Sequence, residues 1–145
     1  FTGAHLVSAI QPNAADQARV AAINMAGGNA QLPGVLAINV LDTLGLISTS
    51  FGQWWGSPDG QGVELVDEAG SRYLSLQFQG DVLIGATSIG MTQHVGALRG
   101  LIQSRLALGP WKDVLLAAPQ RFFEAYLAAT QPDSIARHQA AAACV

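Results

Sequence analysis

Cysteine is almost absent from this sequence, because its 145 residues include a single one, Cys144. One cysteine cannot form an internal disulfide or a cluster of metal-binding thiolates. The three histidines, His5, His94 and His138, lie far apart, and none has a second ligand at suitable spacing, whereas a metal site needs three or four ligands. The sequence therefore predicts no metal site, and the lack of paired cysteines favours a cytoplasmic protein.

Charged residues are also scarce, at 12% of the chain with a formal net charge of −3. The seven basic residues are scattered, so no basic patch indicates nucleic-acid binding. No apolar run approaches the ~20 residues that a membrane helix needs, and no signal peptide is visible. Half of the residues are hydrophobic, which excludes disorder throughout and is enough to build the core of one domain.

Catalytic constellations are missing as well. The serines lie outside any G-x-S-x-G setting, and the acids are most simply explained as solvated helix, loop and turn residues. No strand is followed by G-x-G-x-x-G, since the pair Gly60 and Gly62 lacks both the third glycine and a following helix. We therefore predict no catalytic residue and no dinucleotide phosphate cradle in this chain.

What the sequence does contain is one well-marked helix near its start, predicted at about 13–26. Pro12 disfavours helix for the residue before it, and Asn13 is a suitable N-cap. Gly27-Gly28 provides a left-handed stop. One face of this helix consists of Ala15, Ala18, Ala22 and Met25. Because these residues are nearly all small, another group can approach that face closely.

Alternating patterns then predict a series of strands. They fall at 36–40, 46–51, 63–66, 72–78 and 82–89. The last is apolar on both faces, so we expect it to be the most central, and Gly85 within it indicates a bulge or a close neighbour.

Helices follow the strands. A helix capped by Thr92 is predicted to run to about Leu106, a short one lies near 111–115, and a third begins at Pro119. The third carries an aromatic stripe, Phe122, Phe123 and Tyr126, which is more typical of core than of a cofactor site. Strands followed by helices indicate an α+β fold: a mixed, mostly antiparallel sheet of about five strands with C-terminal helices packed on it.

Trp54-Trp55 lies in a loop rich in glycine, proline and polar residues. Two interpretations stay open: a loop anchor, or a partner surface, since tryptophan is enriched at interface hot spots.

Several segments together resemble a known family. They are Pro12, Gln17-Ala18-Arg19, Asn24-Met25-Ala26-Gly27, Pro33-Gly34-Val35-Leu36, Gly45-Leu46 and Ser50-Phe51-Gly52. They are similar to the last FAD-domain helix and the following interface domain of flavin-dependent NAD(P)H oxidoreductases. The family is the pyridine nucleotide–disulfide reductase superfamily, in its ferredoxin, rubredoxin and nitrite reductase-like branch. Ala18 stands where that family usually has glycine.

This resemblance implies a division of the chain and a site. Residues 1–30 would be the tail of an FAD-binding domain, 33–130 an interface or dimerisation domain, and 131–145 a flexible tail. The helix start would face the pyrimidine side of FAD, through backbone and amide donors of Gln11, Pro12, Asn13 and Gln17. Hydride would pass from nicotinamide to FAD and electrons on to an acceptor.

The resemblance also implies partners, namely the FAD- and NAD(P)-binding domains of a longer parent and a second protomer. The Gly-Asp pair that contacts the flavin's ribityl and phosphate groups in the family is not in this chain. We therefore expect FAD in the parent and a non-catalytic chain by itself. The alternative is a stand-alone binding or assembly subunit of the same fold that docks on a flavoprotein. A small α+β enzyme with an unrecognised pocket has the least support.

Overall fold

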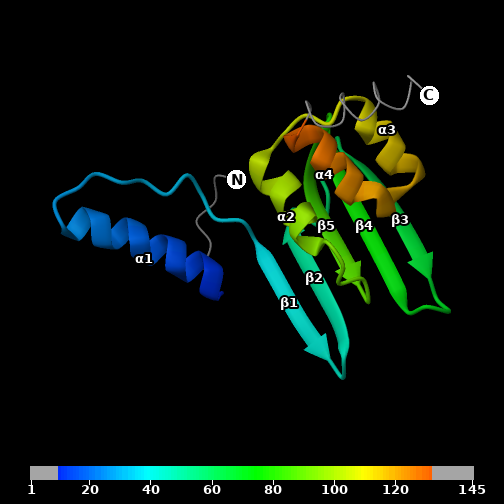
Figure 1. Ribbon diagram of the computed structural model, residues 1–145, viewed down its shortest axis with the longest axis horizontal. Coiled ribbons are helices and arrows are strands. Elements are labelled where there is room, and N and C mark those ends of the chain that lie inside the picture. Colours follow the sequence, from blue (N-terminus) through cyan, green and yellow to red (C-terminus); the bar gives the residue numbers. More distant parts are fainter. Residues whose placement is uncertain (1–9, 132–145) are drawn as a thin grey trace, which may run out of the picture.

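The structure, a computed structural model, describes residues 10–131 (Figure 1). A lone helix, α1 (Gln11–Met25), comes first. The strands are β1 (Ile38–Thr43), β2 (Leu46–Gly52), β3 (Gln61–Asp67), β4 (Arg72–Gln79) and β5 (Val82–Ile89). The later helices are α2 (Val95–Ser104), α3 (Pro110–Ala117), a 3₁₀ turn η1 (Pro119–Arg121) and α4 (Phe122–Thr130). The predicted α+β class is confirmed.

The five strands form one sheet in the order β1-β2-β5-β4-β3. Each pairing in it is antiparallel, so the described sheet contains no parallel pair. The predicted central strand is confirmed, because β5 lies in the middle of the sheet, between β2 and β4. β5 therefore joins an edge hairpin, β1–β2, to the β3–β4 hairpin.

Gly85 has the close neighbour that the sequence predicted. A Cβ added there would lie 2.2 Å from the backbone carbonyl carbon and oxygen of Gln53. Opposite it, the β4–β5 register shifts between Gln77 and Phe78, which is the predicted irregularity. The loop after β2 therefore crosses directly over the central strand.

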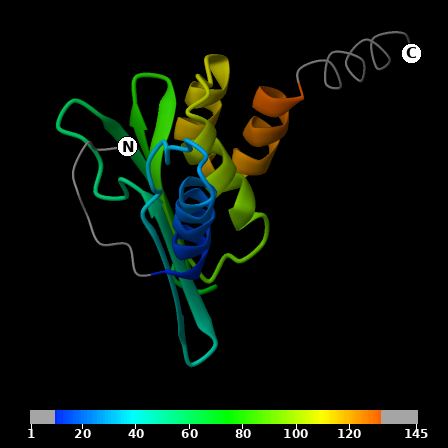
Figure 2. The same ribbon diagram turned by 90° about the vertical axis from the view of Figure 1, so that its left-hand side faces the viewer.

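The core lies between the sheet and the helices, which cover one of its sides (Figure 2). Leu74, Leu76 and Phe78 of β4 point into it, and α2 packs on β2, β5 and α4. The aromatic stripe belongs to this core, as predicted: Phe122 is buried, and Phe123 and Tyr126 pack against the cluster.

The other side of the sheet carries a polar row. Cross-strand partners place Asn39, Ser50, Thr87, Ser75 and Glu64 side by side across five strands. The hydroxyls of Ser50 and Thr87 lie 3.1 Å apart. This alternation of apolar and polar faces is typical of an antiparallel sheet covered on one side.

The predicted boundaries of the second helix were wrong. α2 begins at Val95 with His94 as N-cap at φ +60°, three residues after Thr92. Gly90 donates to the carbonyl of Ile47, so the chain needs the following residues to pass from the sheet to the helix layer. At the other end Arg105 is left-handed and closes the helix after Ser104, which leaves Leu106 beyond the helix and 37% exposed. Of the tail predicted at 131–145, residues 132–145 lie outside the described residues, as do residues 1–9.

Candidate functional site

The first turn of α1 contains three of the four predicted flavin-site residues, but its start differs from the prediction. The helix begins at Gln11, and its N-cap is Ile10, whose backbone is extended and which makes no side-chain cap. Pro12 occupies the second helical position, where a missing N–H breaks no helical hydrogen bond. Asn13 is therefore not the N-cap; it lies inside the first turn.

Asn13 has a different function in the fold. It is the buried residue of α1, with 2% of its surface exposed. Its Nδ2 donates to the carbonyl oxygen of Leu36 at 2.8 Å, across 23 residues of sequence. A long-range contact of this kind explains why the local capping preference failed, since a preference read from neighbouring residues cannot include Leu36.

The structure brings the predicted residues together at one end of the helix. Gln11 is exposed, Pro12 is half-buried, and Gln17 is exposed one turn beyond Asn13. The first hydrogen bond inside α1 runs from the N–H of Ala14 to the carbonyl of Ile10 at 3.0 Å. The N–H groups of Gln11 and Asn13 precede it, at the positive end of the helix dipole. This end can stabilise negative charge on a ligand without any proton transfer.

The other end of α1 stops at Gly27, which has φ +88° as the predicted left-handed stop requires. A clamp that the sequence analysis missed follows it. Asn24 donates from Nδ2 to the carbonyl of Ala30 at 3.0 Å and accepts from the N–H of Ala30 at 2.7 Å. An asparagine three residues before a pair of glycines is the signal that could have indicated a loop closed by side-chain hydrogen bonds.

The small-residue face of α1 is uncovered by the rest of the described chain. Ala15, Ala18 and Ala22 are exposed, and Met25 is 82% exposed. α1 stands apart from the sheet and its covering helices (Figure 1). A hollow of about 300 Å³ lies where α1, the loop after it and the end of α2 meet. Its lining residues are Asp16, Arg19, Val20, Gln31, Leu32, Pro33, Gly34 and Gln103.

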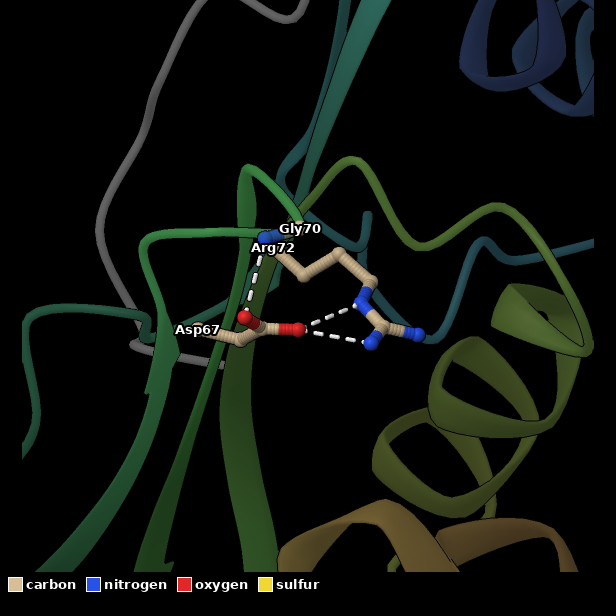
Figure 3. A network of polar contacts seen from close by, with 3 residues as sticks. All are labelled: Asp67, Gly70 and Arg72. Atoms are coloured by element: carbon tan, nitrogen blue, oxygen red, sulfur yellow. Dashed lines mark hydrogen bonds and ion pairs between the residues drawn. The ribbon is translucent and has the colours of Figure 1, made fainter.

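The clearest electrostatic perturbations lie elsewhere, on the β3–β4 hairpin. The N–H of Gly70 and the guanidinium of Arg72 both donate to Asp67 and hold the pKa of its carboxyl below the usual value (Figure 3). Burial, followed by a hydrogen bond to Glu64, raises the pKa of the Tyr73 phenol. β3 is the sheet edge opposite β1, so these groups are explained as hairpin-stabilising contacts remote from α1.

Neither a metal centre nor a membrane helix is found in the described part of the chain. Among residues 10–131, no three side chains of the histidine, cysteine, aspartate and glutamate types gather as metal ligands would. Over the same residues, no helix combines the length and apolar character needed to cross a membrane.

The two tryptophans of the loop after β2 differ in how far they are exposed. The rings meet edge to face with centroids 5.0 Å apart. Trp54 is half-buried, and its backbone nitrogen lies over Gly85 where the loop crosses β5, whereas Trp55 is 63% exposed.

The fold is shared with parts of several solved oxidoreductases. The chain superposes with a TM-score of 0.68 on putidaredoxin reductase in its covalent complex with putidaredoxin, at 19% identity, covering 88% of this chain and 29% of that one. An NAD-dependent persulfide reductase from A. fulgidus gives 0.62 at 21% identity, covering 75% and 24%. An FAD-dependent pyridine nucleotide-disulphide oxidoreductase from Desulfovibrio vulgaris gives 0.58 at 16%, covering 86% and 35%. The architecture is thus that of a portion of such oxidoreductases.

A curated relative agrees with this class. The NADH-dependent phenylglyoxylate dehydrogenase subunit epsilon of Aromatoleum evansii is 32% identical over 122 residues, which is 82% of this chain. The match spans only 29% of the relative's length. The chain matches no protein-family profile. The resemblance inferred from the sequence is confirmed to this extent: the chain shares the fold of part of such oxidoreductases and is similar to a subunit of an NADH-dependent dehydrogenase, which is consistent with a C-terminal portion.

Proposed function

We propose that this chain is the C-terminal interface portion of a cytoplasmic, flavin-dependent NAD(P)H oxidoreductase and is not catalytic by itself. In the whole protein a hydride would pass from the nicotinamide to FAD, and electrons would then leave to an acceptor. The observation that carries the proposal is the 32% identity, over most of this chain, to a subunit named as part of an NADH-dependent dehydrogenase.

Helix α1 would contribute one edge of the FAD site through Gln11, Pro12, Asn13 and Gln17. The residues present fit that limited role, because the helix start offers amide donors and a positive dipole end, which favour the negative charge of a reduced flavin. FAD supplies the hydride chemistry when it is bound. Residues 10–131 include no glycine-rich phosphate loop, so the rest of the cofactor would be held by other parts of the protein.

The division at residues 30–33 fits this role. α1 has a single buried residue and is too short to be a stable helix alone in water, so its exposed small-residue face would pack on the FAD domain. Residues 33–130 have their own core and would form the interface domain, which packs on the FAD- and NAD(P)-binding domains and pairs protomers.

Flavin binding by two forms of the protein tests the proposal. The isolated chain is expected to show little bound FAD and no NADH-driven dye reduction, whereas the whole protein shows both. In the whole protein, Gln17→Ala should weaken FAD binding, while Gln120→Ala, which removes an exposed amide on η1, should not. Robust dye reduction by the isolated chain would contradict the proposal.

A second candidate function follows from the relative's name, which calls it a subunit. In this alternative the chain is a stand-alone binding or assembly subunit that docks on a flavoprotein. The intact mass of the natural protein distinguishes the two: a mass near 15.1 kDa supports the subunit, and a mass several times larger supports the interface portion.

A further inference from the structure

The connection between α1 and the sheet depends on very few contacts. α1 packs extensively on no other described helix or strand, and Asn13 is its one buried residue. The bond from Asn13 Nδ2 to the carbonyl of Leu36 is itself buried. Breaking this bond leaves a buried carbonyl oxygen without a donor, so its loss lowers the free energy of unfolding.

The acceptor belongs to the hydrophobic core of the sheet domain. Leu36 is 4% exposed and is a member of the hydrophobic core. The next residue, Ala37, accepts a hydrogen bond from the N–H of Gly52 at the end of β2, at 2.8 Å. Asn13 is therefore tied to the sheet domain and not to a loop that moves with α1.

The two asparagines of α1 have different roles. Asn24 closes the loop at the helix end by bonding Ala30, six residues away, so it cannot fix the helix relative to the sheet. Asn13 joins the first turn to the sheet domain. That turn also carries the N–H group of Gln11, which the proposed function places beside FAD.

From this geometry we propose that Asn13 is a positioning residue, whose amide holds the first turn of α1 in a fixed place relative to the sheet domain. The inference rests on the proposed function for its effect on FAD, but the tether itself does not. Preorganised donors bind a ligand more tightly because less freedom is lost on binding. Loss of the tether should therefore weaken FAD binding while every side chain of the hydrophobic core stays in place.

The tether is tested in the 145-residue chain without flavin. Spin labels at Ala22→Cys on α1 and Gln120→Cys on the sheet domain, with Cys144→Ser, report the distance between the two parts. Asn13→Leu keeps the side-chain size and adds no charge, yet removes the donor. We expect a distance distribution about twofold broader for Asn13→Leu, and no broadening for the matched control Asn24→Leu.

Asn13→Gln keeps an amide donor on a longer side chain and should narrow the distribution again relative to Asn13→Leu. Circular dichroism and urea unfolding should show the core of each variant intact, because Asn13 is outside it. A distribution for Asn13→Leu as narrow as that of the unsubstituted chain overturns the inference.

The effect on the cofactor is tested in the whole flavoprotein. Asn13→Leu is expected to raise the FAD dissociation constant about tenfold, the factor expected from losing part of one site's preorganisation. It should also shift the flavin midpoint potential to more negative values, because the positive helix end no longer stays beside the reduced flavin. Asn24→Leu should change neither. A broadened distance distribution with unchanged FAD binding and potential supports the tether and overturns the flavin assignment of α1.

Discussion

Helix α1 and the sheet domain that follows it differ in how many of their residues are buried. α1 has 15 residues, of which one is buried. The sheet domain forms a continuous apolar core from β2, β4, β5 and the covering helices. An isolated helix of this length is marginal in water. This difference supports the proposal that α1 packs on another domain, which would cover its small-residue face, whereas the sheet domain has a hydrophobic core of its own.

The sharpest contrast is between a core side chain and an exposed one of similar size. Leu76→Ala should lower the free energy of unfolding by about 2–5 kcal/mol, because Leu76 is 0% exposed and its removal leaves a cavity. Met25→Ala on α1 should change it by less than about 0.5 kcal/mol, because Met25 is 82% exposed. Urea unfolding measures both. Equal losses would break the comparison by showing that α1 belongs to the same core.

A second contrast tests the crossing of the tryptophan loop within the sheet domain. Gly85→Ala should destabilise by about 1–3 kcal/mol, because its Cβ would lie 2.2 Å from the backbone of Gln53. Displacing that loop should also change tryptophan fluorescence. Gly96→Ala is the matched control, since a Cβ there meets nothing within 4 Å. If Gly85→Ala behaves like the control, the loop does not lie on β5 as described.

The tip of the β1–β2 hairpin is the exception within the domain, because it is as exposed as α1. Leu44 is left-handed at φ +54° and fully exposed. Asparagine adopts this conformation more readily than leucine, so Leu44→Asn should stabilise the chain by about 0.5–1 kcal/mol. Leu46→Asn, in the neighbouring strand, should not stabilise. Thermal unfolding that shows a loss for Leu44→Asn would indicate a contact for Leu44 in solution.

The smallest expected effect concerns Asp67 and the acid stability of the far hairpin. Its carboxyl pKa is lowered in the folded state, chiefly by the N–H of Gly70 and then by Arg72 (Figure 3). Because the folded-state pKa is lowered, the ionised carboxylate stabilises the folded chain at pH values above its ordinary pKa of 3.8. This stabilisation is lost as the pH falls through the folded-state pKa.

Asp67→Asn should therefore be slightly less stable than the unsubstituted chain near pH 7, and the gap should close as the pH falls below the ordinary carboxyl pKa of 3.8 and through the lowered folded-state pKa. Urea unfolding at several pH values measures the gap. A difference that persists unchanged into acid would show that the carboxylate charge is not its cause. The ion pair between Asp67 and Arg72 joins β3 to β4, so the substitution should not change the position of α1 at any pH.

Some of the fold follows from the sequence by itself. The alternating residues of β2 and β4 and the doubly apolar β5 determined where the strands lie and which is central, because side-chain periodicity is a local property. Gly27 determined the end of α1 in the same way, since a left-handed residue is a local requirement. The family-like segments also gave the class of protein, which the relatives confirm.

The tertiary structure decided what depends on distant partners. Asn13 reads locally as an N-cap, yet the carbonyl of Leu36, 23 residues away, makes it a buried tether. The local sequence predicts a helix start at Thr92. The hydrogen bond from Gly90 to Ile47 of β2 instead keeps the chain at the sheet, and the helix begins at Val95. In both cases the competing contact joins segments that only the folded chain brings together. For Asn13 that contact is a buried hydrogen bond, which outweighs a capping preference of similar or smaller size.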